Sequence, residues 1–225
     1  MLMREVRDVL SSSKAAGWVL EPDAKRLFSF LGLDVPRFVC TKKVEEAIQF
    51  AHEIGYPVVG KVVSPKLVHK SEKNGVEIAI DNDERLREAF RRFSKMDGFT
   101  GILVEEMISG IELIVGAKVD DQFGPVILLG IGGTGVEIYK DVTLRMAPVA
   151  SKDIESMIRC LKAHSLLEGS RGSKPVNLEE LNRLLKIFSD FVMDLDGLFE
   201  SIDLNPVFCS ATRCVVADAR IMLRQ

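Results

Sequence analysis

The middle of the chain places three strand-like runs in succession, with no helical stripe between them. The runs are IELIVGAKVDD, GPVILLGIGG and GVEIYKDVTLRMAPV, separated by the polar turn 120–124 and by a glycine cluster. Runs of β-branched and apolar residues that are broken only by turn residues are typical of strands joined directly to one another. This half of the chain therefore predicts a mostly antiparallel sheet and argues against a chain of alternating βαβ units.

Helices and further strands lie on both sides of this region. Apolar stripes of helical period, with capping residues at their ends, are the signal for the helices. Helices are expected from about Pro22 to Gly32, Thr41 to Gly55, Asp81 to Phe93, Ser151 to Ala163 and Asn177 to Met193. Further strands are expected in YPVVGKVVS and VEIAI and in a C-terminal hairpin-like pair, FESIDLNPVFC and RCVVADARIML.

The order of these elements predicts an α+β fold with two lobes. We expect residues 35–105 to form a smaller lobe and 106–225 a larger lobe, on which the N-terminal segment 1–34 packs. A cleft between two lobes is a favoured place for a ligand.

Composition restricts the partners that such a chain can have. The formal net charge is −3 and the pI is near 5.7, which does not suit binding to nucleic acid or to an anionic membrane. No run reaches the roughly 18 apolar residues of a membrane span. The four cysteines are scattered and lack zinc-ligand spacing. We expect a cytoplasmic protein with free thiols.

One motif suggests a different function. Gly130, Gly132 and Gly135 have the spacing of a dinucleotide-binding turn, which requires a helix to begin at the last glycine. The residues that follow, VEIYKDVTLRM, alternate like a strand and have no helical stripe. We therefore interpret the glycines as a tight connection between two antiparallel strands, where the backbone can approach a reacting group closely.

Lys61 and three glutamates are candidates for binding a nucleotide. Lys61 is flanked by valines, so either it lies on the wet face of an edge strand or its ammonium points into the cleft to bind phosphate. Glu105, Glu106 and Glu112 follow or begin strands, where backbone groups can read an adenine edge and a carboxylate can accept both hydrogen bonds of a ribose diol. Glutamates that simply face solvent are the alternative.

Asp203, Asn205 and Asp218 form a candidate metal site. Asp203 and Asn205 are two residues apart on one expected strand, so both point to the same face. Asp218 from the next strand can join them and complete a set of hard oxygen ligands for magnesium. A solvated polar face is the alternative. His69, on a loop, is either an ordinary surface histidine or a nucleophile for a terminal phosphate.

Several long blocks of the sequence resemble one known family. The blocks are GYPVVGKVVSPKLVHKSEKNGV, ILVEEMISGIELIVGAKVDDQFGPVILLGIGGTGVEIYKDVTLRMAPV, LLEGSRGSKPVN and SIDLNPVF with VVADARI. In order and spacing they are similar to the ATP-grasp β subunit of ADP-forming acetate–CoA ligase, from about Glu21 to the C-terminus. Kinship extends to the succinyl-CoA synthetase β subunit. The resemblance implies an ATP-grasp fold, with the nucleotide between two α+β lobes.

The resemblance also implies roles for particular residues. By resemblance, Lys61 contacts the nucleotide phosphates and Glu112 the ribose, while His69 carries phosphate as a phosphohistidine. Arg145 is implied near the transferred phosphate, where a fixed cation stabilises developing charge. The segment Glu105, Glu106, Met107 and Ile108 is implied to read adenine, and Asp203, Asn205 and Asp218 to hold Mg²⁺. The loop Arg171–Gly172 also matches the family, without a derived role.

The reaction implied is reversible: acyl-CoA, ADP and phosphate give the free acid, CoA and ATP. ATP or ADP and Mg²⁺ are the implied cofactors of this chain. Because it has no CoA-binding Rossmann lobe, CoA and a first phosphohistidine are expected on a separate α subunit, in an α2β2-like assembly. The glycine loop, with Glu137 just behind it, is expected to border the phosphate-transfer site opposite His69.

The family loop departs from its usual sequence here in two places. Glu72 replaces an aspartate, and Asn74 precedes Gly75 where paired glycines are usual; Asn tolerates the left-handed conformation, so we expect the loop to survive. Two other functions stay open at this point. One is a stand-alone ATP-grasp carboxylate–amine ligase that works through an acyl phosphate, and the other is a non-catalytic regulatory module.

Overall fold

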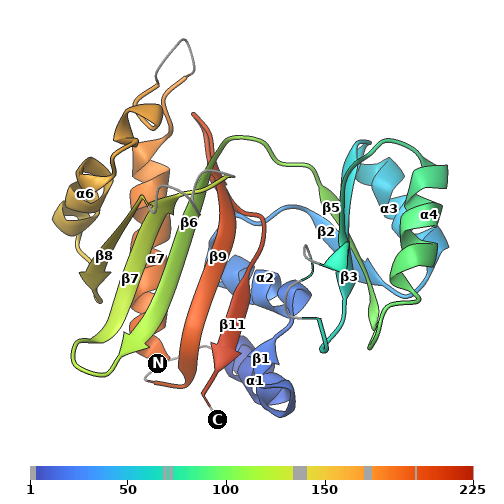
Figure 1. The fold of residues 1–225 in the computed structure, drawn as a ribbon, viewed down its shortest axis with the longest axis horizontal. Helices are drawn as coiled ribbons and strands as arrows, with labels where there is room; N and C mark the ends of the chain where they lie inside the picture. Colours follow the sequence, from blue (N-terminus) through green and yellow to red (C-terminus); the bar gives the residue numbers. More distant parts are fainter. Residues whose placement is uncertain are drawn as a thin grey trace. The chain divides into compact units, whose positions relative to one another are not determined.

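The chain folds into two compact units, each with its own antiparallel sheet (Figure 1). The structure is a computed structural model that describes residues 4–67, 70, 73–133, 141–169, 174–195 and 197–224. The smaller unit is Pro36–Ile108, and the larger unit combines Met1–Val35 with Ser109–Gln225. Helices pack with strands in both units, so the predicted α+β class is confirmed.

The smaller unit is a four-stranded sheet with strand order β2-β5-β3-β4. Its elements are β2 (Phe38–Thr41), α3 (Val44–Ile54), β3 (Val58–Val63), β4 (Val76–Ile80), α4 (Asp83–Phe93) and β5 (Gly101–Glu106). The apolar stripes of α3 and α4 pack on one face of the sheet, around residues such as Val62, Val104 and Phe93. Because side chains alternate along a strand, β3 and β5 present their other residues to the opposite face.

The larger unit is a seven-stranded sheet with strand order β1-β11-β9-β6-β7-β8, and β10 pairs with β9. Its first elements are α1 (Arg4–Ser13), the 3-10 turn η1 (Lys14–Ala16), β1 (Trp18–Val19) and α2 (Glu21–Phe30). The middle ones are β6 (Ile111–Asp120), β7 (Gly124–Ile131), β8 (Val142–Met146), α6 (Ser151–Cys160) and η3 (His164–Leu166). The last are α7 (Leu178–Asp194), β9 (Phe199–Cys209), β10 (Cys214–Val216) and β11 (Arg220–Leu223).

The antiparallel arrangement predicted for the middle of the chain is confirmed. β6 pairs antiparallel with β7, and β7 with β8. The expected C-terminal hairpin is more complex, because RCVVADARIML forms two strands, β10 and β11, that both pair with β9. Asp218 lies in the break between them.

Register divides the larger sheet into two faces. Residues paired across antiparallel strands point to the same side. One row of partners is Ile202, Ala117, Ile127 and Arg145 across β9, β6, β7 and β8, and the neighbouring row is Asp203, Gly116, Leu128 and Leu144. The first row belongs to the inner face, which packs with α6 and α7 into the main core, and Figure 1 shows α7 behind the strands. We call the face that carries the second row the outer face.

Several helix ends differ from the sequence prediction. The N-terminal segment contains a helix, α1, that continues through Ser13. Asn82, not Asp81, caps α4: its side chain accepts a hydrogen bond from the backbone N of Arg85 at 3.0 Å. Asn177 caps α7 as predicted, through hydrogen bonds from two backbone N–H groups. Among the helices that the structure describes, none has the length and apolar character needed to cross a membrane.

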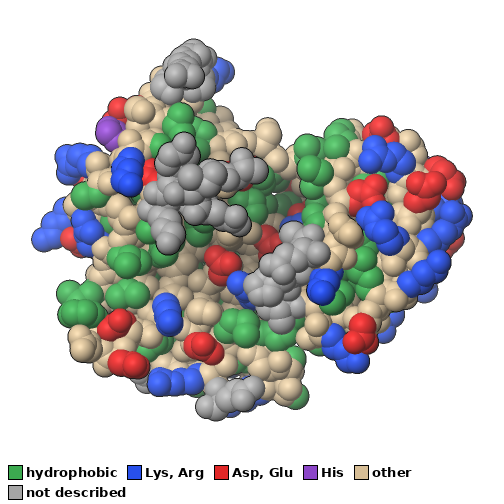
Figure 2. All heavy atoms as spheres, viewed as in Figure 1, with side chains coloured by type: hydrophobic (Ala, Val, Ile, Leu, Met, Phe, Trp, Pro, Cys, Tyr) green, Lys and Arg blue, Asp and Glu red, His purple; other side chains and the backbone are tan. Residues whose placement is uncertain are grey.

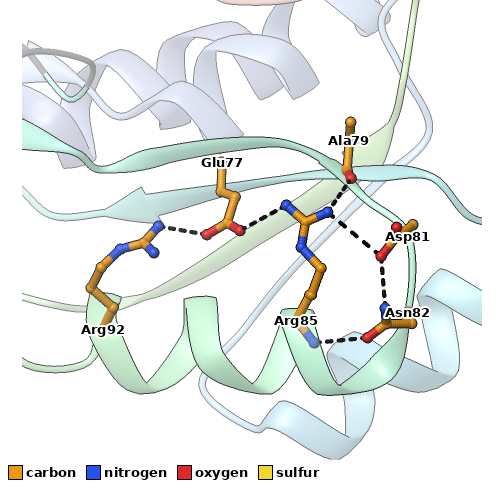
Figure 3. A network of polar contacts seen from close by, with 6 residues as sticks. All are labelled: Glu77, Ala79, Asp81, Asn82, Arg85 and Arg92. Carbon is orange, nitrogen blue, oxygen red and sulfur yellow. Dashed lines mark hydrogen bonds and ion pairs between the residues drawn. The ribbon is translucent and has the colours of Figure 1, made fainter.

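Two arginines of α4, Arg85 and Arg92, are tied to β4 (Figure 3). Glu77 of β4 accepts from Arg92 Nη2 at 2.7 Å and lies 3.5 Å from Arg85 Nη2. Arg85 also donates to the carbonyl of Ala79 at 3.2 Å and lies 3.6 Å from a carboxylate oxygen of Asp81. The two arginines are therefore partly exposed structural contacts that hold the helix on the sheet.

All four cysteines are free, as expected. Cys209 and Cys214 are buried and directly opposed across β9 and β10, whereas Cys160 is exposed. A hydrogen bond with Cys214, together with burial, raises the pKa of the Cys209 thiol well above its ordinary value. The Cys209 thiol therefore stays protonated and packs as a small apolar group.

The N-terminal part of the larger unit buries a complete ion pair within one helix. Lys25 Nζ lies 3.0 Å from Glu21 Oε1 in α2, and their side chains are 0% and 2% exposed. A buried ion pair is a weak source of stability, yet removing one of the two residues leaves a buried charge without this partner. The pair therefore makes α2 sensitive to single substitutions.

We expect Lys25→Met to lower the free energy of unfolding by about 3–5 kcal/mol, because the Glu21 carboxylate stays buried without the lysine. The double variant Glu21→Leu/Lys25→Met should recover most of that loss. Equilibrium unfolding in urea measures both values. Lys43→Met, which removes an exposed pair with Glu46, is the control and should change the free energy far less. Equal losses in the single and double variants would contradict this account.

Candidate functional site

Lys61 lies in a central strand and forms a buried ion pair. β3 lies between β5 and β4, so the edge-strand interpretation of this lysine is wrong. Lys61 Nζ is 2.9 Å from Glu105 Oε1, and the two side chains are 7% and 3% exposed. Lys61 is paired with Leu103, and Glu105 with Val59. The two charged residues are therefore diagonal neighbours on the sheet face opposite α3 and α4.

The segment that follows Glu105 leaves the sheet at a fixed position. β5 ends at Glu106, whose backbone N donates to the carbonyl of Arg37 at 3.0 Å. The Glu106 side chain accepts a hydrogen bond from Arg37 Nε at 2.9 Å. Met107 is 45% exposed, and Ile108 is partly buried. Arg37 could not be identified from the sequence, because it lies next to Glu106 only through the pairing of β2 with β5.

Glu112 lies on the outer face of β6, under the glycine turn. The backbone N of Gly132 donates to the Glu112 carbonyl at 2.6 Å. A β-carbon at Gly132 would lie only 2.9 Å from Glu112 Cβ, whereas one at Gly133 would lie 3.6 Å from Glu112 Oε2. Gly133 has φ +89°, which other residues rarely adopt. The turn therefore needs Gly132 to approach Glu112 closely, and Gly133 to adopt a positive φ.

The described residues agree with the interpretation of the glycines as a connection between two antiparallel strands. β7 contains Gly130 and ends at Ile131, and the next described element is the antiparallel strand β8. Gly135 of the motif and Glu137, expected behind this turn, lie outside the described residues. So do His69 and the Arg171–Gly172 loop.

The candidate metal ligands come from β9 and from the break after β10. Asp203 shares the outer face with Glu112, because its partner on β6 is Gly116, which lies on the same side of that strand as Glu112. The β6–β9 register shifts between Leu113 and Val115, which places Asn205 in a bulge. Asp203 Oδ2 also contacts Arg220 Nη2 at 3.3 Å. The sequence could have indicated Arg220 only if the pairing of β9 with β11 had been known.

These donors suit magnesium by their chemistry. Two carboxylates and an amide offer only hard oxygen atoms, as Mg²⁺ prefers. Across the described ranges, no group of three or more His, Cys, Asp or Glu side chains is arranged to hold a metal ion. Mg²⁺ at nucleotides is usually bound by one or two carboxylates together with the phosphates, so this donor set suits magnesium that nucleotide phosphates also hold.

Arg145 is not brought together with Glu112 and Asp203. Its register partner is Ile127, so it belongs to the inner face, whereas Glu112 and Asp203 belong to the outer face. Its guanidinium donates to Ser156 Oγ at 2.8 Å and to the Leu144 carbonyl at 2.7 Å. These contacts tie the edge strand β8 to α6. The loop residue Asn74 has φ +56°, which confirms the left-handed conformation expected there.

Comparisons with known proteins agree with this architecture. The ATP-grasp domain family matches residues 11–223. The β subunit of ADP-forming acetate–CoA ligase I from Pyrococcus furiosus is 42% identical over 97% of this chain and 98% of its own length. The ADP-forming 4-hydroxybutyrate–CoA ligase of Nitrosopumilus maritimus is 38% identical over 91% of this chain, but only over 31% of its own length.

A solved structure has the same fold. It is the dinucleotide forming acetyl-coenzyme A synthetase 1 of Ca. Korarchaeum cryptofilum, with coenzyme A, Mg-AMPPCP and a phosphohistidine segment pointing towards the nucleotide binding site. It is 38% identical, with a TM-score of 0.84 over 97% of this chain and all of the matched one. The resemblance in the sequence is thus confirmed over nearly the whole chain. The chain belongs to the ATP-grasp domain family, within the group formed by the β subunits of ADP-forming acetate–CoA ligases.

Proposed function

We propose that this chain is the nucleotide-binding subunit of an ADP-forming acyl-CoA ligase. It would transfer a phosphoryl group reversibly between ADP or ATP and a histidine, while acyl-CoA is formed or cleaved on a partner subunit. The observation that carries the proposal is the buried Lys61–Glu105 pair at 2.9 Å. Lysine is rarely buried, and burying it costs desolvation energy, so a binding role explains its place in a central strand better than a role in folding does.

Each ligand group has a chemical reason for its role. Lys61 offers a compact cation for phosphate oxygens, and Glu105 holds its ammonium in place before the nucleotide arrives. Glu106, Met107 and Ile108 would place backbone groups beside adenine. Glu112 would accept hydrogen bonds from the ribose diol.

Asp203, Asn205 and Asp218 would hold magnesium against the nucleotide phosphates. When bound, the metal supplies neutralisation of phosphate charge, which phosphoryl transfer requires more than covalent help from the protein. Arg220 would keep the Asp203 carboxylate oriented. The geometry of Arg145 supports a structural role at β8 rather than the phosphate contact that the resemblance implies.

A CoA-binding α subunit is the proposed partner, in an α2β2-like assembly. Support comes from the subunit name of the Pyrococcus relative and from the additional length of the Nitrosopumilus ligase. Those two relatives are named for different acids at similar identity. We therefore propose that the choice of acid depends mainly on the partner.

We expect Lys61→Ala to weaken MgATP binding by about 10- to 100-fold, since a charge-assisted hydrogen bond is worth roughly 1.5–3 kcal/mol. Isothermal titration calorimetry on the isolated chain measures the affinity. Lys61→Met/Glu105→Gln, which leaves no buried charge, separates a binding defect from misfolding. Lys66→Ala removes an exposed lysine of the same unit, paired with Asp97, and should bind like the wild type. Unchanged affinity in both Lys61 variants would exclude the phosphate role.

Glu112→Gln should weaken binding of MgATP about tenfold, because it removes roughly 1.4 kcal/mol of hydrogen bonding to the ribose diol. Binding of the 2′,3′-dideoxy analogue should not change, because it lacks the diol. Gly132→Ala should reproduce this selective loss, since its β-carbon would displace Glu112. Calorimetry with the two nucleotides makes the comparison. Equal loss for both would show that Glu112 does not contact the ribose.

We expect His69→Asn to keep MgATP binding and to lose ATP formation from acyl-CoA, ADP and phosphate in the presence of the CoA-binding subunit. The histidine is needed for the transfer step but not for nucleotide affinity. His52→Asn, at an exposed histidine that contacts Asp83, is the control and should retain both. Full turnover by His69→Asn would favour the carboxylate–amine ligase alternative, which needs no phosphohistidine.

A further inference from the structure

An apolar strip covers the end of the larger sheet. Phe123, Leu144 and Met146 are 62%, 52% and 60% exposed, and Figure 2 shows hydrophobic atoms at the surface over β7 and β8. Register joins them to their neighbours on the outer face through the pairs Val126–Met146, Leu128–Leu144 and Gly130–Val142. We call Val126, Leu128, Val142, Leu144 and Met146 the outer strip. Contiguous apolar surface of this kind marks an interaction site.

The outer strip continues directly from the proposed nucleotide ligands. The row Asp203, Gly116, Leu128 and Leu144 crosses β9, β6, β7 and β8 on one face. Three strand spacings separate its ends, or about 14 Å. Gly116 has no side chain to interrupt the row. A partner that covers the outer strip is thus placed beside Asp203.

A partner can contact the face of β8, but it cannot extend the sheet by pairing with the edge of β8 at Leu144. Ile131 N donates to Asp141 O, and Ala147 N to Pro125 O, which makes Leu128–Leu144 a non-hydrogen-bonded pair in the alternating ladder. The backbone carbonyl of Leu144 therefore points away from β7, and Arg145 Nη1 donates to it at 2.7 Å. Arg145 blocks strand addition at this position, since a guanidinium occupies the exposed acceptor.

We infer that the outer strip is where the CoA-binding partner subunit docks, an inference that rests on the proposed function. The transferred phosphoryl group must leave the nucleotide towards the partner, and the strip lies on the face that carries Glu112 and Asp203. A second copy on the strip would bring no place for the acyl-CoA chemistry, which the proposed function assigns to the partner subunit. The strip also has the anatomy of an interface, an apolar centre beside the exposed polar residues Lys118, Asp121 and Gln122.

Charge placed on the strip tests the inference. The double variant Leu144→Glu/Met146→Glu should weaken binding of the purified CoA-binding subunit at least tenfold in surface plasmon resonance. It should bind MgATP like the wild type in calorimetry. Ile78→Glu is the matched control, because Ile78 is a 63% exposed apolar residue on β4, the edge strand of the smaller unit. This variant should bind the partner normally.

The possible outcomes separate this inference from the proposed function. Normal partner affinity in the double variant overturns the docking site and leaves the proposed function intact. A wild-type chain that binds neither MgATP nor the CoA-binding subunit overturns both. If sedimentation shows that the wild type self-associates and the double variant is monomeric with unchanged partner affinity, the occupant is a second copy and the inference is wrong.

Discussion

The ion pair between Lys61 and Glu105 is the contact on which the function proposed for the smaller unit depends. Lys61 stands in β3, between two other strands, where its backbone is fixed by β4 and β5. Burying two charges gives little net stability, so the pair is better explained by what the lysine can bind than by folding. Glu105 serves twice, because it orients the ammonium and begins the segment proposed to read adenine. Arg37 fixes the end of that segment through Glu106.

In the larger unit, the register of the strands determines where the proposed ligand groups lie. Side chains alternate between two faces, so a shift of one residue would exchange the core for the ligand groups. Ile202, Ala117 and Ile127 are buried on the inner face, which fixes Asp203 and Gly116 on the outer one. The glycine turn then positions Glu112 through the backbone of Gly132. Core packing and the placement of the proposed ligands are therefore set by the same hydrogen-bonded ladder.

The sequence was sufficient wherever the signal is local. Periodicity and capping identified α2, β3 and α7, and Asn177 caps α7 as expected. The sequence was insufficient to predict contacts and sheet faces that depend on the pairing of strands far apart in the chain. The face of Arg145 depends on its pairing with Ile127, and the partners of Lys61 and Asp203 come from strands far away in the chain. Asp81 and Asn82 are both good capping residues, and only the extended backbone of Asn82, with φ −159°, decides between them.

The proposed ligand groups are held by contacts within their own unit. Lys61 is held by Glu105 and Glu106 by Arg37 in the smaller unit, while Glu112 is held by Gly132 and Asp203 by Arg220 in the larger one. Within each unit, the proposed ligand groups are thus fixed by contacts of the protein itself. Preorganised groups lose little side-chain entropy on binding. The binding energy of the nucleotide is then available to align the phosphates for transfer, which is the contribution that phosphoryl transfer most needs from a protein.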